Sequence, residues 1–122
     1  MMIVSIAAEY HALFNSKFDL SAYSEKYQTA AKAAVSNLLG GISYFVGETE
    51  QFDEDGKRVK TEKGSLLTAV PGRSFFPRGF IWDEGFHQLV ISEWNITLSE
   101  EILRSWFNRI EPSVEIPTRC YE

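Results

Sequence analysis

Cysteine and basic residues are both scarce in this chain of 122 residues. Its one cysteine, Cys120, has no partner for an intrachain disulfide, so a disulfide-stabilised scaffold is excluded. Acidic residues outnumber Lys and Arg by 17 to 12, and the net charge is −5. Because such a chain has no excess of positive charge to attract phosphates, we expect no nucleic acid among its partners and no binding to an anionic membrane surface.

Long apolar runs are missing as well. The N-terminal stretch MMIVSIAA has no basic residues before it and breaks at Glu9, which makes it too short for a signal peptide or a membrane span. Any membrane attachment is therefore expected to come from a segment absent from this chain.

Residues that hold metal ions are also few. The acidic run at 53–56 lacks the ligand spacing of a calcium loop. Near residue 83, one histidine and two acids with no cysteine nearby are too few ligands for zinc. We therefore expect no metal site and no cofactor.

Apolar residues recur at helical spacing in four places, which predicts a mainly α fold. We expect Ser21 to cap the second helix, which stops at Gly40–Gly41, and Thr97 to open a capping box with Glu100 on the fourth. The four stripes are Ile3, Ile6, Ala7, Tyr10, Leu13 and Phe14; Tyr23, Tyr27, Ala30, Ala31, Ala34, Val35 and Leu38; Trp82, Phe86, Leu89, Val90 and Trp94; and Leu98, Ile102, Leu103, Trp106, Phe107 and Ile110.

A small β excursion interrupts the helices. The segment Ile42–Gly47 (ISYFVG) is rich in β-branched and aromatic residues, which is typical of a short strand. The charged segment 48–63 is expected to be a surface loop or hairpin that turns at Asp55–Gly56. Residues 66–81 contain two Pro and two Gly without a period, so they are predicted to be an irregular loop, and residues 111–122 form a divergent tail.

Aromatic residues make up 14% of the chain and gather in GRSFFPRGFIWDEGFHQLVISEW, residues 72–94. There, Asp83 and Glu84 open a helix, and His87 follows Asp83 by four residues on the same helical face. A carboxylic acid placed against aromatic side chains can have its pKa raised and serve as a general acid, although the dipole at a helix N-terminus opposes this. On chemistry alone, ordinary first-turn acids and a partly buried histidine are the favoured interpretation.

The same segment carries a family resemblance. RSFFPRGFIWDEGFHQLVISEW is similar to the signature of the processing α-glucosidases of glycoside hydrolase family 63. On either side, SNLLGGISYFVG (36–47) and LSEEILRSWF (98–107) resemble further segments of that family. The resemblance implies a partial (α/α)6 barrel, with residues 1–122 a fragment of the catalytic domain, because twelve barrel helices need about 200 residues or more.

The resemblance also implies an activity. Enzymes of this kind act in the lumen or membrane of the endoplasmic reticulum and remove the terminal α-1,2-linked glucose from the triglucosylated N-glycan with inversion. A glucosylated N-glycan oligosaccharide is thus the implied partner. The general acid would be Asp83, and the general base would come from a later part of the catalytic domain, outside this chain. The candidates for lining or supporting the substrate site are Arg78, Phe80, Trp82, Glu84, Phe86 and His87.

Two alternatives stay open. Since the chain alone lacks a base, one is a non-catalytic fragment that acts at most as a sugar-binding or interaction remnant. The other is part of a different inverting (α/α)6 glycosidase, such as a trehalase-like enzyme. In a fragment, helix faces meant for missing neighbours stay exposed, and we expect this of Leu103, Trp106 and Phe107.

One modification motif is present. Asn95-Ile96-Thr97 is an N-glycosylation sequon, which suits a lumenal protein. Thr97 would also serve as a helix cap, and sequons arise often by chance. Asn95 is therefore a candidate glycosylation site, conditional on lumenal delivery.

Overall fold

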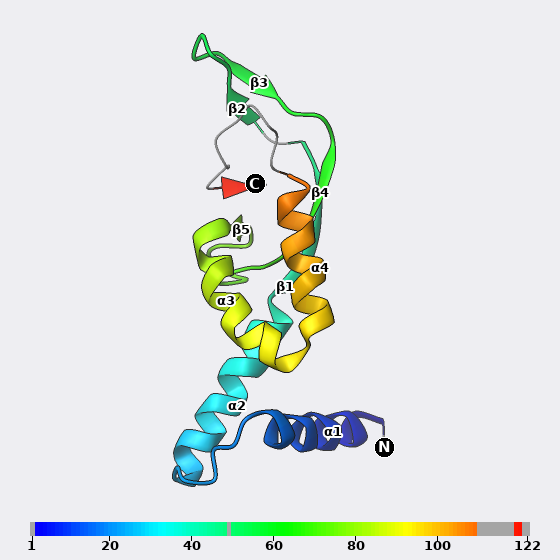
Figure 1. Cartoon of the computed structure of the whole chain (residues 1–122), viewed down its shortest axis with the longest axis vertical. Coiled ribbons are helices and arrows are strands. Elements are labelled where there is room, and N and C mark those ends of the chain that lie inside the picture. The colour runs from blue at the N-terminus through cyan, green and yellow to red at the C-terminus, as the bar shows by residue number, and fades with distance from the viewer. Residues whose placement is uncertain (1, 49, 110–118, 121–122) are drawn as a thin grey trace. The chain divides into compact units, whose positions relative to one another are not determined.

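The computed structural model describes residues 2–48, 50–109 and 119–120, which form a mixed helical fold with small antiparallel sheets (Figure 1). The chain divides into two compact units, Met1–Asn37 and Leu38–Glu122. The helices are α1 (Met2–Lys17), α2 (Glu25–Gly40), α3 (Ile81–Trp94) and α4 (Ile96–Phe107). The strands are β1 (Ile42–Gly47), β2 (Glu50–Phe52), β3 (Arg58–Lys60), β4 (Gly64–Ala69), β5 (Gly79–Phe80) and β6 (Arg119–Cys120).

In the first unit, one buried ring and one hydrogen bond join α1 to the middle of α2. Phe14 is buried, with the Phe18 ring 5.1 Å away and the Lys32 ammonium 5.7 Å from the ring centre. The Tyr10 hydroxyl donates to the Lys32 carbonyl at 2.6 Å. The helix predicted from the stripe between Ile3 and Phe14 is confirmed.

The predicted cap of α2 at Ser21 is wrong. The helix begins at Glu25, and the Ser24 carbonyl accepts hydrogen bonds from the amides three and four residues further on. The Ser21 hydroxyl instead donates to Asp19 at 2.7 Å, in a turn before the helix. Short polar side chains compete with helix backbone in this way, so a serine near a helix start is not always its cap.

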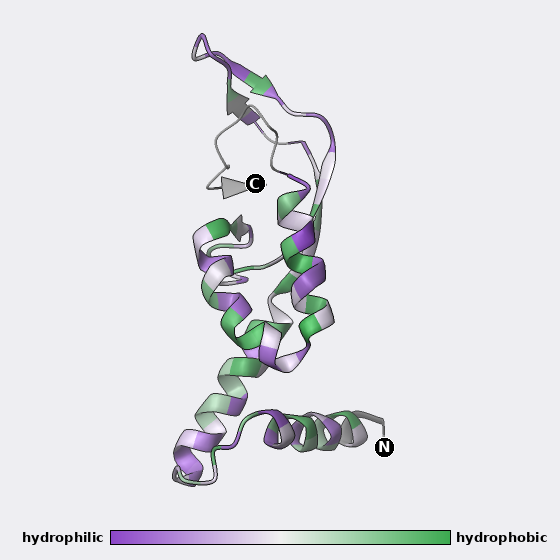
Figure 2. Cartoon of the chain, in the orientation of Figure 1, coloured by the Kyte–Doolittle hydropathy of each residue, from purple (hydrophilic) through white to green (hydrophobic). Residues whose placement is uncertain are grey.

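The second unit begins with a long hairpin. β1 pairs with β4 from Ile42 opposite Ala69 to Gly47 opposite Gly64. β2 and β3 pair further out, across a turn in which Gly56 has φ of 74°. Glycine suits this left-handed backbone because it has no Cβ to clash. The outer part of the hairpin is mostly hydrophilic (Figure 2).

The expectation of an irregular loop over 66–81 is wrong at its start. β4 occupies Gly64–Ala69, and Leu66, Thr68 and Ala69 in it are buried. Its sequence, GSLLTA, shows no alternation of polar and apolar residues, and in the structure the strand pairs with β1 along one edge and packs against α4.

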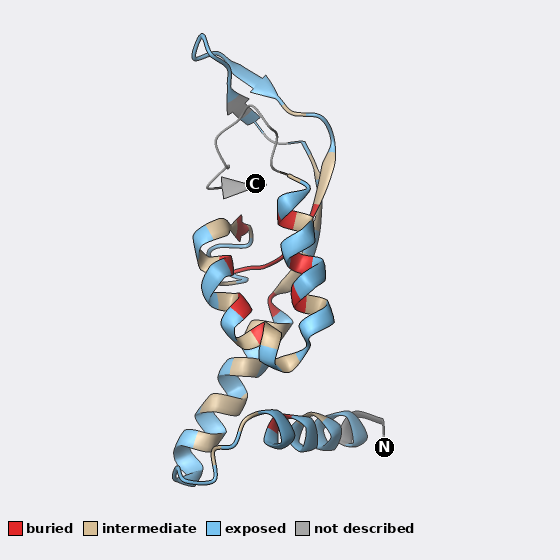
Figure 3. Cartoon of the chain, viewed as in Figure 1, coloured by how far each residue is buried: buried red, intermediate tan, exposed pale blue. Residues whose placement is uncertain are grey.

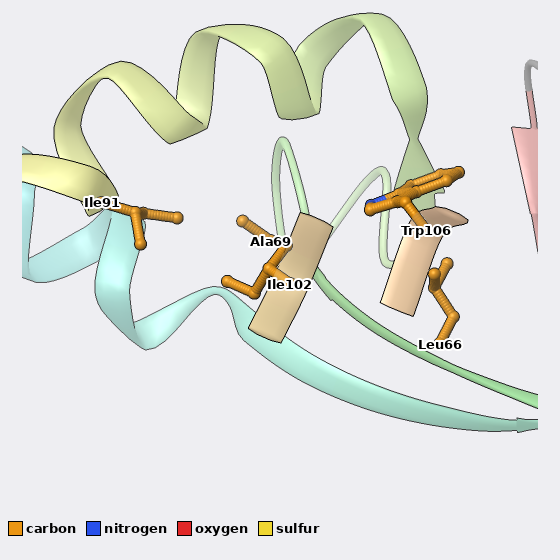
Figure 4. Packing of buried hydrophobic residues seen from close by; sticks show 5 residues of the cluster. All are labelled: Leu66, Ala69, Ile91, Ile102 and Trp106. Atoms are coloured by element: carbon orange, nitrogen blue, oxygen red, sulfur yellow. The ribbon is translucent and has the colours of Figure 1, made fainter. Parts of the chain in front are cut away.

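The core of the second unit lies between β4 and the helices α3 and α4, which run in opposite directions (Figure 1). Buried positions of this unit gather on β4 and on the sides of the two helices that face it (Figure 3). The packed cluster consists of Leu66, Ala69, Ile91, Ile102 and Trp106 (Figure 4). It unites one strand and two helices, with Ile91 near the end of α3 as the contribution of that helix.

The buried face of α3 is not the predicted apolar stripe. Its buried residues are Glu84, Gln88 and Ile91, spaced by four and three positions. Phe86 and Leu89, from the predicted stripe, are exposed. The helix therefore turns a largely polar face towards β4 and α4, which requires that every polar group there has a hydrogen-bond partner.

The start of α4 also differs from its prediction. The helix begins at Ile96, and its N-cap is Asn95, whose side chain accepts a hydrogen bond from the Leu98 amide at 3.1 Å. The capping box predicted at Thr97 is therefore wrong. Asn95 ends α3 and begins α4, which makes it the corner between the two helices.

The outer face of α4 is exposed, with one exception to the prediction. Phe107 is 65% exposed and Leu103 is exposed too, as expected. Trp106 was expected on that face but is only 5% exposed, because it packs in the core against β4. Ile110, the last residue of the predicted stripe, lies outside the described residues.

No helix in the described part of the chain is long and apolar enough to cross a membrane.

Replacing two glycines by alanine should change the free energy of unfolding in opposite directions. A Cβ at Gly79 would lie 2.9 Å from a Leu66 methyl and 3.1 Å from atoms of Thr68 and Trp106, whereas one at Gly85 would meet nothing within 4 Å. Gly79→Ala should lower the free energy of unfolding by about 1–3 kcal/mol through overpacking. Gly85→Ala, inside α3, should raise it by roughly 0.5–1 kcal/mol through helix propensity. Urea unfolding measures both, and equal effects would contradict the packing at Gly79.

Candidate functional site

The site begins at the first turn of α3. The residue before the helix, Phe80, has extended backbone angles (φ −131°, ψ 122°), and its side chain makes no capping hydrogen bond. Three residues further on, Asp83 and Glu84 lie side by side in the sequence but occupy different surroundings. One is buried and the other is half-buried.

Glu84 is 2% exposed, and both of its carboxylate oxygens accept hydrogen bonds from the protein. Oε2 accepts from the Thr68 hydroxyl, from the Ala69 amide at 2.9 Å and from the Trp106 indole at 3.4 Å. Oε1 accepts from the Gln88 amide at 2.5 Å. A carboxylate can accept several hydrogen bonds through its two oxygens, and Glu84 accepts four.

The hydrogen-bond network continues from α3 into α4. The Gln88 side-chain oxygen accepts from the Ser99 hydroxyl at 2.6 Å. Further along α4, the Ser105 hydroxyl accepts from the Leu67 amide of β4 at 2.8 Å. Buried polar groups thus connect β4, α3 and α4 behind the first turn of α3, and such networks specify one arrangement of the elements they join.

Asp83 has the opposite character. It is half-buried, and no residue in the described ranges donates a hydrogen bond to its carboxylate or forms an ion pair with it. Its oxygens are therefore available to a group from outside the described residues. Of the two adjacent acids, only Glu84 accepts hydrogen bonds from the described residues.

His87 follows Asp83 by one helical turn and is half-buried. Its Nδ1 atom is buried and has no hydrogen-bond partner among the described residues. A buried polar atom without a partner is uncommon and calls for one, such as a ligand or another part of the protein. No group of three or more His, Cys, Asp or Glu residues in the described part of the chain could hold a metal ion.

Aromatic rings surround the first turn. Trp82 and Phe86 are 70% and 64% exposed and meet edge to face, with ring centres 5.9 Å apart. In the preceding segment, Phe76 and Phe80 also meet edge to face at 6.2 Å, and the Arg78 guanidinium lies 5.9 Å from the Phe80 ring centre. Exposed aromatic faces bind apolar surfaces of a ligand or of neighbouring protein segments.

Four partners of the site were not predicted from the sequence: Thr68, Gln88, Ser99 and Trp106. Gln88 lies four residues after Glu84, the spacing at which helical side chains meet, so it could have been found. Thr68 and Ser99 come from other elements, and no local pattern points to them. Glu84, a candidate for lining or supporting the substrate site, has its oxygens turned towards protein donors.

The chain matches known proteins over most of its length. Residues 2–119 match the family model of the glycosyl hydrolase family 63 C-terminal domain. The chain is 39% identical to alpha-glucosidase 2 of Arabidopsis thaliana, over 93% of the chain and 16% of that protein. It is 38% identical to a mannosyl-oligosaccharide glucosidase of the same plant, over 89% of the chain and 14% of that protein. It is 43% identical to the mannosyl-oligosaccharide glucosidase of Saccharomyces cerevisiae, over 84% of the chain and 14% of that protein.

The chain therefore spans less than a fifth of each of these relatives. The match includes the whole first turn of α3, with both acids and the aromatic segment before them. On this match over nearly all of its residues, the chain belongs to glycosyl hydrolase family 63.

Proposed function

We propose that this chain is part of the catalytic domain of an exo-α-glucosidase, and that Asp83 is its general acid. The substrate would be the triglucosylated N-glycan precursor, from which the enzyme removes the terminal α-1,2-linked glucose. Family membership and relatives named as mannosyl-oligosaccharide glucosidases support this substrate class. The single observation that carries the assignment of the acid is that Asp83 has no partner among the described residues while Glu84 is fully engaged.

In the proposed reaction, Asp83 donates a proton to the glycosidic oxygen as the bond to the glucose anomeric carbon breaks. Water attacks that carbon from the opposite face and loses its proton to a second carboxylate, so the configuration inverts. In inverting enzymes the two carboxyl groups lie about 6.5–9.5 Å apart to leave room for the water. We expect that base from another part of the complete (α/α)6 barrel.

The neighbouring side chains suit a sugar. We propose that the exposed rings of Trp82 and Phe86 contact the sugar, and that one of the two, which lie edge to face, stacks on the apolar face of a pyranose ring. Arg78, held against Phe80, can donate hydrogen bonds to sugar hydroxyls. His87 has a buried nitrogen that a hydroxyl or a further protein group would satisfy. We place the whole protein in the lumen or membrane of the endoplasmic reticulum, where such glycans are processed.

A chimera tests this function. The aligned segment of the Saccharomyces cerevisiae relative is replaced by this chain, and the protein is given triglucosylated oligosaccharide. We expect glucose to be released first as the β-anomer, detected by NMR before mutarotation. Release of the α-anomer first would mean retention and would contradict the inverting mechanism. No release by a folded chimera would contradict the function.

A second candidate function is sugar binding without catalysis. The exposed rings of Trp82 and Phe86 favour it, since they could hold a glucose residue even where no base is present. Titrating a glucose-terminated oligosaccharide into the 122-residue chain, with tryptophan fluorescence as the signal, separates the two. Binding by the chain together with an inactive chimera would favour the binding function.

We further propose that Asn95 is glycosylated. Its Oδ1 accepts the cap hydrogen bond, which leaves the exposed Nδ2 for a glycan. In the chimera made in yeast, digestion with an N-glycanase should convert residue 95 to aspartate, as read by peptide mass spectrometry. Thr97→Ala should abolish this conversion while leaving α4 intact, because the cap comes from Asn95. An unmodified Asn95 in the unsubstituted chimera would contradict the proposal.

A further inference from the structure

The first turn of α3 lacks the usual local support of a helix start. Its N-cap residue, Phe80, is extended and contributes no side-chain acceptor. The first amide groups of a helix have no partners within the helix, so an uncapped first turn tends to fray. Asp83 lies in this turn, and any fraying would move its carboxylate.

Glu84 links this first turn to hydrogen-bond donors outside the helix. Its Oε2 is held by two groups of β4, the Thr68 hydroxyl and the Ala69 amide, and is reached by the Trp106 indole of α4. Its Oε1 is held by Gln88, which Ser99 of α4 holds in turn. The donors come from both elements that flank α3, so the carboxylate ties the turn on two sides.

The chain just before α3 is tied to the same groups. Gly79 approaches Leu66, Thr68 and Trp106 so closely that a Cβ there would clash. Two of these residues, Thr68 and Trp106, also donate to Glu84. Both the entry to the helix and its first turn are thus fixed against one small region of β4 and α4.

We propose that Glu84 is the positioning residue of the site, which holds the first turn of α3 and so sets the direction of the neighbouring Asp83 carboxylate. It acts through the reach of its hydrogen bonds and makes no contact with substrate. The catalytic consequence rests on the proposed function of Asp83 as the general acid. The positioning itself does not, since it concerns only groups within this chain.

Two substitutions separate reach from charge. Glu84→Gln keeps the length of the side chain: its oxygen can accept from Thr68 and Ala69, and its amide can donate to Gln88 once the Gln88 side chain flips. Glu84→Asp keeps the charge but is one methylene shorter, so it no longer reaches β4. Glu93→Gln, at an exposed acid of the same helix, is the control.

Carbon-13 NMR of the aspartate side chains shows whether the surroundings of the Asp83 carboxylate change. The chain contains only four aspartates, Asp19, Asp53, Asp55 and Asp83, so a sample labelled at their carboxyl carbons gives four resonances. Asp83→Asn removes the resonance of residue 83 and so identifies it. Glu84→Asp introduces a fifth aspartate and therefore a fifth resonance, and the double variant with Asp83→Asn identifies the Asp83 resonance in that background. We expect Glu84→Asp to displace and broaden the Asp83 resonance, and Glu84→Gln and Glu93→Gln to leave it in place.

Two NMR results would overturn the proposal that Glu84 positions Asp83. An Asp83 resonance unchanged in folded Glu84→Asp overturns the proposal, because a purely structural glutamate would alter only stability. A resonance displaced by Glu84→Gln but not by Glu84→Asp overturns it too, because charge would then be the cause. If Glu84→Asp does not fold, Thr68→Val replaces it, since this removes one donor of the same carboxylate with little change in volume, and the same displacement is expected.

Steady-state kinetics of the chimera test the effect of Glu84 on catalysis. Glu84→Asp should lower kcat by about 10–100-fold with KM changed less than about twofold, because misplacement of a reacting group affects the chemical step. An unchanged kcat would overturn the catalytic consequence. If instead Asp83→Asn leaves hydrolysis intact, the proposed function fails by itself, and the Asp83 resonance still reports whether Glu84 positions its neighbour.

Discussion

Asp83→Asn should lower kcat/KM of the chimera on the glucosylated oligosaccharide by about a thousandfold, within the 10²–10⁴-fold range of general acid catalysis. Asparagine has nearly the same shape as aspartate but carries no proton that it can transfer to the glycosidic oxygen. The loss should fall mainly on kcat, because the interaction matters in the transition state more than in the bound substrate. Steady-state hydrolysis with glucose detection measures it.

The fold should survive this substitution. Asp83 accepts no hydrogen bond from any described residue, so Asp83→Asn should change the free energy of unfolding by less than about 0.5 kcal/mol, as for most surface changes. Glu93→Gln, on the same helix, should keep full activity. Retained hydrolysis in Asp83→Asn would remove this residue from the acid role, and loss of folding would show that it has a structural one.

Glu84→Ala should have the largest effect on stability in the chain. It removes the acceptor of four donors, of which the Thr68 hydroxyl and the Ala69 amide belong to buried residues. The Thr68 hydroxyl can still donate to the Ala69 carbonyl, 3.0 Å away, but the buried Ala69 amide is left without a partner, which costs about 1–3 kcal/mol beyond the hydrogen bonds that are lost. Since domains have about 5–15 kcal/mol in total, this is a large fraction of the stability of the second unit. Circular dichroism and urea unfolding measure this.

Glu93→Ala is the matched control, because it also removes a glutamate side chain from α3 but at an exposed position. It should change the free energy of unfolding by less than about 0.5 kcal/mol. A small effect of Glu84→Ala, comparable to that of Glu93→Ala, would mean that the buried network contributes little to the fold. The positioning proposal for Glu84 would then lose its physical basis.

The presence of the four helices is readable from the sequence, because the periodicity of apolar residues is a local feature. The starts of α2 and α4 were harder to predict, since Ser and Thr are good caps in general. In the structure Ser21 binds Asp19 in a turn before α2, and Asn95 caps α4 in place of Thr97. β4 could have been inferred: β1 needs a partner, and the charged segment 48–63 leads directly to Gly64. What its sequence lacks is the alternation by which half-buried strands are recognised.

The faces of α3 and α4 depend on tertiary structure and could not be read from spacing alone. Both apolar and polar residues recur at helical spacing on α3, and the buried face is the one with Glu84 and Gln88, because β4 and α4 supply donors to it. Trp106 is buried because it packs against residues of β4, and these contacts could not be predicted because β4 is far from Trp106 in the sequence. Sequence therefore indicates two adjacent acids in an aromatic segment, but only the fold separates the buried one from the available one.

If Asp83 donates the proton to the leaving group, a substrate that needs no such proton should largely escape the effect of Asp83→Asn, and this comparison is the most direct test of the acid role. α-Glucosyl fluoride is such a substrate, because fluoride leaves without protonation. Its hydrolysis by the Asp83→Asn chimera should fall less than about tenfold, while hydrolysis of the oligosaccharide falls about a thousandfold. An equal fall on both substrates, or none on either, would contradict the acid role of Asp83.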